Sequence, residues 1–240
     1  MPIDNTTIVI TGAASGIGLA TAMLAAQRGA SVVLFDLDAS ALDRAAASLP
    51  DGQVATVAAD VTSPAGHADA VRAAVDAFGG FDAWVNNAGL ARHAAIPDAT
   101  EQQIDLMMDV NLKGTILGSQ AALRHLAPKG AGTIINIIST ASLRGIPTES
   151  VYCATKWAVR GFTQALQEEA AAAGVRATAL LPGGVDTPFW DTAREGEVPR
   201  GAMLNAGDIA RSVMQVLELD PAVVIREMQV RGINDRDFGA

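Results

Sequence analysis

The fold of this chain is decided by residues 7–18, whose sequence is T-I-V-I-T-G-A-A-S-G-I-G. The first five residues are rich in β-branched side chains, which is typical of a buried parallel strand. Gly12, Gly16 and Gly18 follow in a turn, and residues 19–28 predict a helix that ends at Gly29. Such a turn lets a pyrophosphate approach closely, and the helix N-terminus offers N–H donors. The stretch therefore predicts a dinucleotide-binding unit, although its glycine spacing is G-x-x-x-G-x-G rather than G-x-G-x-x-G.

The next apolar run, residues 31–35, ends in Asp36, which lies 18 residues after Gly18. A carboxylate at this position can accept hydrogen bonds from both ribose hydroxyls and repels a 2′-phosphate. No Arg or Lys stands at positions 13–15 or directly after Asp36. The sequence therefore favours NAD over NADP. The alternative is that Asp36 caps the helix predicted over residues 39–49.

Strand and helix patterns continue to alternate along the chain. Strands are predicted over residues 53–58, 82–85, 133–138, 175–180 and 222–226, and helices over 64–78, 101–126, 152–173 and 206–219. This alternation predicts an α/β fold, a doubly wound parallel sheet of about seven strands with helices on both faces. Asp60, Asn87 and Ser139 all follow predicted strands, so we expect them beside Asp36 and the glycine turn at the ligand-binding edge.

Composition excludes several functional classes. The chain has 240 residues, half of them apolar, which suits a single domain over residues 1–240. A net charge of −9 argues against nucleic acid as a partner. No apolar run reaches the ~18 residues of a membrane span, and no signal peptide is visible. The single Cys153 fits a reducing, cytoplasmic compartment. His67, His93 and His125 lack ligand-like spacing, so no metal is expected and all three are interpreted as surface or packing residues.

A second motif occupies residues 139–156, S-T-A-S-L-R-G-I-P-T-E-S-V-Y-C-A-T-K. Tyr152 and Lys156 are four positions apart, so on a helix they share one face. An ammonium beside a phenol favours the phenolate, so we expect Lys156 to lower the pKa of Tyr152. Such a tyrosine can exchange a proton with an alcohol or carbonyl oxygen, to which Ser139 can also offer its hydroxyl. Taken alone, such a pair is far more often an ordinary surface pair on a helix.

Together these motifs resemble those of the short-chain dehydrogenase/reductase family over essentially the whole chain. The matching segments are T-G-A-A-S-G-I-G (11–18), D-V (60–61), N-N-A-G (86–89), Asn111, Ser139, Y-C-A-T-K (152–156) and P-G-G-V-D-T (182–187). The resemblance implies a Rossmann-type fold and hydride transfer between a nicotinamide and a secondary alcohol or ketone.

The resemblance also implies roles for individual residues. Tyr152 would be the general acid/base, Lys156 would lower its pKa and bind the nicotinamide ribose, Ser139 would hold the substrate oxygen, and Asn111 would position a water. The cofactor would contact Gly12, Ser15, Gly16, Ile17, Gly18, Asp36, Leu37, Asp60, Val61, Asn87, Ala88, Gly89, Val110, Tyr152, Lys156, Pro182, Gly183, Val185 and Thr187. Members are usually dimers or tetramers that associate through the helix containing Lys156, so a homodimer or homotetramer is expected.

In this family the segment at about 183–206 covers the substrate. Phe189, Trp190 and Met203 there suggest an apolar lid with Gly196 and Gly201 as hinges, or equally well core residues that anchor the loop. Leu143, Val151 and Phe189 are the predicted pocket walls. Apart from Arg92 and Arg144, no fixed cation is positioned to hold a substrate carboxylate. We therefore expect a neutral, fairly apolar alcohol or ketone as the small-molecule substrate.

Three other functions remain open at this stage. A 3-oxoacyl-carrier-protein reductase-like enzyme needs a basic docking surface, whereas the long helix ends with Glu168 and Glu169. A non-catalytic NAD-binding regulator is possible because fold does not fix function, but such proteins typically lose the catalytic Tyr or Lys. An epimerase or dehydratase with bound NAD generally needs a longer C-terminal region.

Overall fold

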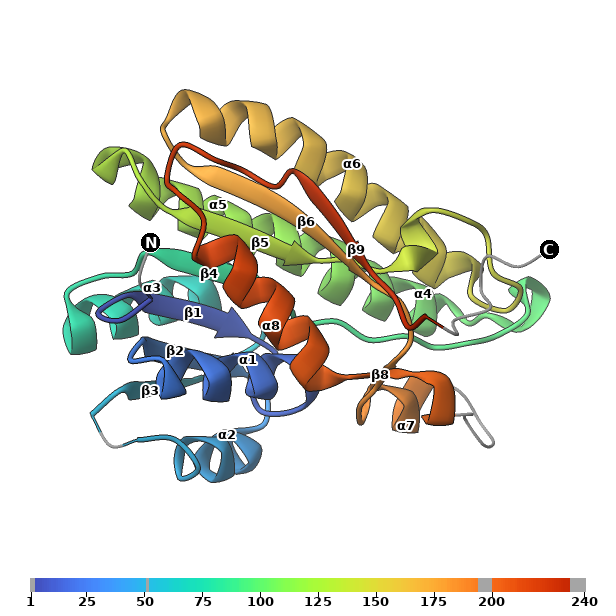
Figure 1. Ribbon diagram of the computed structural model, residues 1–240. Helices are drawn as coiled ribbons and strands as arrows, with labels where there is room; N and C mark the ends of the chain where they lie inside the picture. The colour runs from blue at the N-terminus through green and yellow to red at the C-terminus, as the bar shows by residue number, and fades with distance from the viewer. Residues whose placement is uncertain (1–2, 51, 194–199, 234–240) are drawn as a thin grey trace.

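A seven-stranded parallel sheet forms the centre of the protein in the computed structural model, which describes residues 3–50, 52–193 and 200–233 (Figure 1). Its strand order is β3-β2-β1-β4-β5-β6-β9. The strands are β1 Thr7–Thr11, β2 Ser31–Asp36, β3 Val54–Ala58, β4 Ala83–Asn86, β5 Thr133–Ile137, β6 Arg176–Pro182 and β9 Glu227–Val230. From β1 the strands are added toward one edge of the sheet as far as β3, and from β4 they are added toward the other edge. Ligands in folds of this kind bind at the point between β1 and β4 where the strand order reverses.

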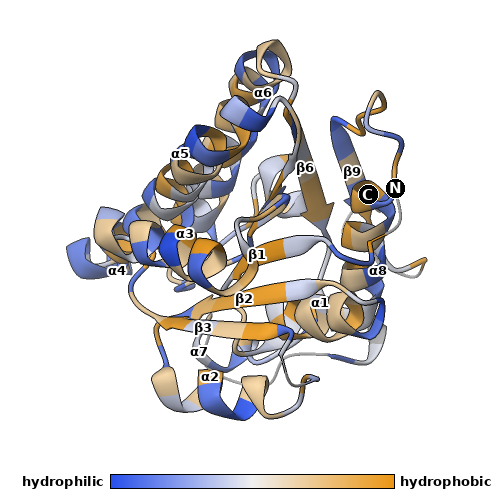
Figure 2. Ribbon diagram, turned by 90° about the vertical axis from the view of Figure 1, so that its left-hand side faces the viewer, coloured by the Kyte–Doolittle hydropathy of each residue, from blue (hydrophilic) through white to orange (hydrophobic). Residues whose placement is uncertain are grey.

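Helices cover both faces of the sheet (Figure 2). Ile8, Ile10 and Leu34 pack with α1 Gly16–Gln27, α2 Ala39–Ala46 and α8 Ala206–Leu217. The alternate residues Val9 and Phe35 pack with α3 Pro64–Phe78, α5 Gly114–Leu126 and α6 Ser150–Ala172. Both sides of each strand are buried because successive side chains point to opposite faces. The expected doubly wound α/β fold is therefore confirmed.

The single helix predicted over residues 101–126 contains a π-helical turn. The segment consists of α4 Glu101–Met107, the π-turn η2 Met108–Lys113 and then α5, and Thr100 and Gln103 form a capping box at its start. Asn111 lies within the π-turn and its side chain is fully buried. A π-turn widens the helix locally and often occurs at functional sites. Asn111 is therefore distinguished from an ordinary polar helix residue by its place in the π-turn.

The last strand begins later than the sequence predicts. We expected a strand over residues 222–226, but β9 is Glu227–Val230, and Val224 is 44% exposed. The guanidinium of Arg176 donates to the carbonyls of Asp220 and Val223 at 3.2 Å each. These carbonyls are bonded to a side chain, and the pairing with β6 begins only at Glu227. The other predicted boundaries agree with the structure to within three residues.

A small second sheet lies beside the main one. It pairs β7 Val185–Asp186 with β8 Leu204–Asn205, and α7 Phe189–Ala193 and the short turn η5 Arg200–Ala202 lie between them. Three further short turns are η1 Ile96–Asp98, η3 Ala127–Lys129 and η4 Thr140–Ser142. No helix in the described ranges is long and apolar enough to cross a membrane.

Candidate active site

A cavity of about 420 Å³ opens at the carboxyl ends of the central strands. It is lined by nearly all of the cofactor residues that the resemblance implied, namely Gly12, Ser15, Gly16, Ile17, Asp36, Leu37, Asp60, Val61, Asn87, Ala88, Gly89, Val110, Tyr152, Lys156, Pro182, Gly183, Val185 and Thr187. Ser139 also lines it, whereas Gly18 and Asn111 are not among the lining residues. The structure therefore gathers into one cavity residues that are spread over most of the sequence.

The glycine turn forms the floor of one end of this cavity. Gly12 has a φ of +62° and Gly16 a φ of +53°, a left-handed conformation that glycine adopts without strain. A Cβ at Gly18 would lie only 2.1 Å from the carbonyl oxygen of Gly12. The Asn87 side chain donates to the carbonyls of Thr11 and Gly12 at 3.0 Å each, which fixes the turn against β4. The N-terminus of α1 consequently faces the cavity with its N–H groups.

Asp36 ends β2 at the same end of the cavity. Its carboxylate accepts hydrogen bonds from the backbone N–H of Ala14 at 3.0 Å and of Leu37 at 2.8 Å. These bonds orient the carboxylate, and its remaining lone pairs stay available to a ligand. In the structure Asp36 therefore joins β2 to the glycine turn, and the helix cap of α2 is the neighbouring Asp38, whose side chain accepts from Ala41 N–H.

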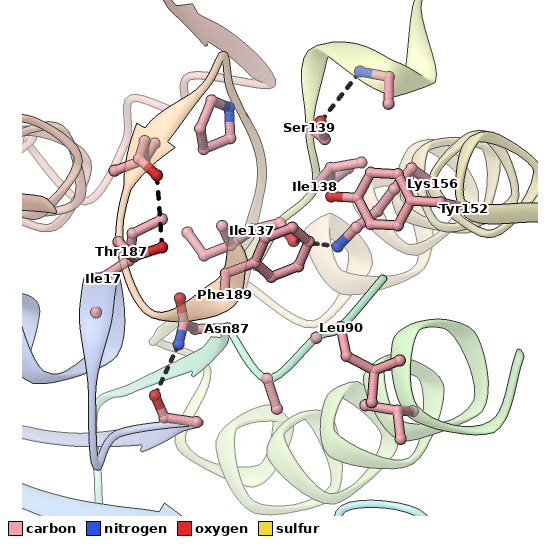
Figure 3. Close-up of a pocket in the computed structure, with 18 of the residues that line it drawn as sticks. Ile17, Asn87, Leu90, Ile137, Ile138, Ser139, Tyr152, Lys156, Thr187 and Phe189 are labelled. Carbon is pink, nitrogen blue, oxygen red and sulfur yellow. Dashed lines mark hydrogen bonds between the residues drawn. The ribbon is translucent and has the colours of Figure 1, made fainter. Parts of the chain in front are cut away.

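Ser139, Tyr152 and Lys156 meet at the other end of the cavity (Figure 3). Ser139 follows β5, and Tyr152 and Lys156 lie in the first two turns of α6. The Ser139 hydroxyl interacts with the Tyr152 hydroxyl and lowers its pKa, and Lys156 Nζ lies 5.6 Å from the centroid of the Tyr152 ring. Lys156 Nζ also donates to the carbonyl of Ile137 at 3.3 Å. The three side chains thus form one constellation, in which Tyr152 and Lys156 are buried and Ser139 is half-buried.

The pKa of Tyr152 departs from the sequence-based expectation. We expected Lys156 to lower it, but burial raises the pKa of Tyr152 above its usual value, and the interaction with Ser139 only partly offsets this. Burial also lowers the pKa of Lys156 to about 8, which leaves it an ammonium at neutral pH. The expectation was wrong for this structure because desolvation of the phenolate has the largest effect on this pKa.

Asn111 binds the loop that follows β4. Its Oδ1 accepts from Leu90 N–H and its Nδ2 donates to the Leu90 carbonyl, both at 2.8 Å. A Cβ at Gly89 would lie 3.2 Å from Asn111 Oδ1 and 3.5 Å from Lys156 Nζ, so the three residues are in close contact. Asn111 therefore holds this loop beside Lys156, and its proposed role in positioning a water stays a prediction.

The predicted substrate residues divide into two groups. Phe189 lines the cavity, and its ring centroid lies 5.9 Å from that of Tyr152. Leu143 and Val151 are not among the lining residues; they pack in the adjoining clusters instead. Trp190 lines the cavity, and its Nε1 donates to the Val185 carbonyl at 2.8 Å. Helix α7 therefore forms part of the cavity wall and is also anchored to β7. The proposed hinge Gly196 lies outside the described residues.

Sequence reasoning missed two ionisable lining residues, His93 and Glu149. Glu149 lies three positions before Tyr152, and this helical spacing was a usable signal. His93, which we interpreted as a surface or packing residue, carries no such signal. Tertiary contacts bring it to the cavity, because its N–H donates to the Ala193 carbonyl at 2.7 Å and the next N–H donates to that of Thr148 at 2.9 Å.

Comparisons with known proteins agree with this geometry. The family model for short chain dehydrogenases matches residues 6–198. The chain is 37% identical over 237 residues to a 2-(S)-hydroxypropyl-CoM dehydrogenase from Xanthobacter autotrophicus, covering 92% of this chain and 93% of that protein.

Two solved structures are also similar to this chain. One is a 3-ketoacyl-(acyl-carrier-protein) reductase from Brucella melitensis complexed with NADH, with a TM-score of 0.88, 31% identity, and coverage of 96% of this chain and 98% of that one. The other is an alcohol dehydrogenase from Thermococcus sibiricus complexed with 5-hydroxy-NADP, with a TM-score of 0.86, 31% identity, and coverage of 95% and 97%. The sequence match, the shared fold and the constellation of Ser139, Tyr152 and Lys156 agree, and the chain belongs to the short-chain dehydrogenase/reductase family of oxidoreductases.

Proposed function

We propose that this protein is an NAD-dependent dehydrogenase or ketoreductase that interconverts a secondary alcohol and a ketone. The observation that carries the proposal is the meeting of Ser139, Tyr152 and Lys156 at one end of a cavity whose other end is formed by the glycine turn and Asp36. A proton-transferring group and a dinucleotide site in one cavity are what hydride-transfer chemistry requires.

The cavity suits a nicotinamide dinucleotide. Gly12 and Gly16 leave the turn without side chains where a pyrophosphate would lie. A Cβ at Gly12 would lie 2.9 Å from Ala88, and a Cβ at Gly16 would lie 3.3 Å from Thr187. The N-terminus of α1 supplies N–H donors there, and Asp36 supplies a carboxylate for a ribose. The similar solved structures are described as complexes with NADH and 5-hydroxy-NADP, which supports a nicotinamide cofactor.

The protein's own residues would manage the proton. A bound nicotinamide supplies the hydride donor or acceptor. Burial keeps the Tyr152 phenol protonated, which is the form that donates a proton to a carbonyl oxygen during reduction. Ser139 offers a second hydroxyl to the same oxygen. The buried Lys156 ammonium lies beside the Tyr152 ring. Its positive charge favours the phenolate form of Tyr152, which is needed for alcohol oxidation.

The cofactor preference is tested by a pair of charge-neutralising variants. We expect wild-type protein to use NAD with a kcat/KM about 100-fold or more above that for NADP, because the Asp36 carboxylate and a 2′-phosphate repel each other in a partly buried site. Asp36→Asn should lower this ratio at least tenfold, as measured by steady-state absorbance of reduced nicotinamide. The matched control is Asp38→Asn, two positions away, where Asn still caps α2. An unchanged ratio in Asp36→Asn, or a wild type that prefers NADP, would contradict the assignment.

We also propose that the protein forms a homodimer or homotetramer. Trp157 on α6 is 49% exposed, and Ile116 on the neighbouring α5 is 36% exposed. A Cβ at Gly161 on α6 would meet nothing within 4 Å, so a second helix can approach closely there. We expect light scattering to give a mass of two or four times 24.6 kDa. Trp157→Glu should shift this mass toward the monomer, and a wild-type mass of 24.6 kDa would refute the proposal.

A carrier-protein reductase is the second candidate, favoured by the similarity to the Brucella melitensis enzyme. Glu168 and Glu169 at the end of α6 would repel an acidic carrier. For this reason we rank a free alcohol or ketone above a carrier-bound acyl chain.

A further inference from the structure

Two ionisable side chains face each other in the part of the cavity around Tyr152. Leu90, Ile146, Phe189 and Trp190 give this part apolar walls. His93 and Glu149 line the same cavity, with side chains only 8% and 16% exposed. His93 Nε2 and Glu149 Oε1 are 3.7 Å apart. A polar pair in an apolar substrate pocket is the kind of feature that sets specificity.

The backbone holds both residues in place. Glu149 is the N-cap residue of α6, and its carbonyl accepts from Cys153 N–H at 2.8 Å. The backbone of His93 is bonded to Ala193, and its ring packs edge-on against Trp190 with centroids 6.0 Å apart. The separation of the two side chains is therefore a product of the fold, since each is carried by a segment with its own hydrogen bonds.

The separation of 3.7 Å suits an inserted oxygen atom. It is too long for a direct hydrogen bond, yet one oxygen can lie about 2.8 Å from both atoms. An imidazole N–H donates and a carboxylate accepts, and a hydroxyl group can bond to both because it accepts one hydrogen bond and donates another. An ammonium cannot accept from the imidazole, and a carboxylate cannot donate to Glu149.

The charges lining the cavity disfavour anionic substrates. Among the lining residues that the structure describes, Lys156 is the only lysine or arginine, and it lies beside Tyr152 at 5.6 Å from the ring centroid. Arg92 and Arg144 are not lining residues. An anionic group near Glu149 would meet a like charge.

We propose that His93 and Glu149 bind a second hydroxyl of the substrate, so that the preferred substrate is a neutral diol or hydroxyketone. The inference rests on the proposed function, because Tyr152 must act on the first oxygen. A purely structural role is the competing explanation, since the pair also joins the loop after β4 to the start of α6. A structural role would affect all substrates alike, whereas a binding role affects only those that carry the second hydroxyl.

Cyclohexanol and the 1,2-, 1,3- and 1,4-cyclohexanediols test this inference with NAD, because they present the second hydroxyl at three separations. We expect wild-type kcat/KM for at least one diol to exceed that for cyclohexanol about tenfold or more, the effect of a hydrogen bond to a charged group. Glu149→Gln and His93→Phe preserve side-chain size and should each reduce this ratio at least fivefold, mainly through KM for the diol. Glu169→Gln makes the same chemical change on an exposed part of α6 and should leave the ratio unchanged.

A binding measurement separates this inference from the proposed function. Thermal shifts with each alcohol in the presence of NADH report binding without turnover. A diol-specific shift that is lost in Glu149→Gln, without any turnover, would retain the hydroxyl site and refute the dehydrogenase. Turnover with equal kcat/KM for cyclohexanol and all three diols would retain the dehydrogenase and overturn the hydroxyl site. Equal losses for every substrate in both variants would also overturn it and assign the pair a structural role.

Discussion

Replacing Tyr152 by Phe is expected to lower kcat by a factor of about 10²–10⁴, the usual contribution of a positioned general acid/base. The variant lacks the hydroxyl that exchanges a proton with the substrate oxygen, while its ring still packs against Phe189. Binding of NADH, followed by fluorescence, should change little because Phe keeps the ring and all other residues of the proposed cofactor site are unchanged. Turnover within threefold of wild type would show that Tyr152 is not the proton-transferring group.

The raised pKa of Tyr152 can be measured directly, because this is the only tyrosine in the chain. We expect phenolate absorbance to remain absent in the folded protein as pH passes the ordinary tyrosine value of about 10. A folded-state pKa above the unfolded value means that the folded protein holds the proton more tightly. The resulting contribution to stability is therefore complete below pH ~10 and is lost as the pH rises further. Phenolate absorbance in the folded protein below that pH would contradict the dominance of burial.

Replacing Gly18 by Ala is expected to reduce the free energy of unfolding by about 3 kcal/mol, at the upper end of the usual cost of overpacking. The added Cβ would lie 2.1 Å from the Gly12 carbonyl oxygen and 2.7 Å from Asn87 Nδ2. Neither atom can move freely, because Asn87 Nδ2 itself bonds the carbonyls of Thr11 and Gly12. The glycine turn must shift, so the affinity for NADH should fall together with the melting temperature.

A second Gly→Ala change provides the matched control. Gly207 lies in the first turn of α8, where a Cβ would contact only the Arg211 side chain at 3.6 Å. Gly207→Ala should leave NADH affinity unchanged and stabilise the protein by up to about 1 kcal/mol, since Ala favours a helix over Gly. Calorimetry and a fluorescence titration measure both quantities. A Gly18→Ala variant as stable as wild type would show that α1 can move away from the turn.

The sequence motifs were sufficient to predict that the glycine turn, Asp36 and Asn87 line one cavity. The glycine turn, Asp36 and Asn87 each follow a strand, and parallel strands bring their carboxyl ends to one edge of the sheet, so local patterns predict a shared location. The end of the cavity around Tyr152 was predicted less well. Phe189 lines the cavity as expected, but Leu143 and Val151 do not, because a position in a loop or at a helix start does not reveal which way a side chain points.

The amino-acid sequence alone determined the alternation of strands and helices, the glycine turn and the Tyr152–Lys156 spacing, because these depend on local periodicity and local backbone conformation. Three features were decided only by the tertiary structure. The π-turn that buries Asn111, the raised pKa of Tyr152 and the placement of His93 opposite Glu149 all depend on segments distant in sequence. Burial and the distances between side chains arise only when those segments pack together, so no pattern within a single segment contains them.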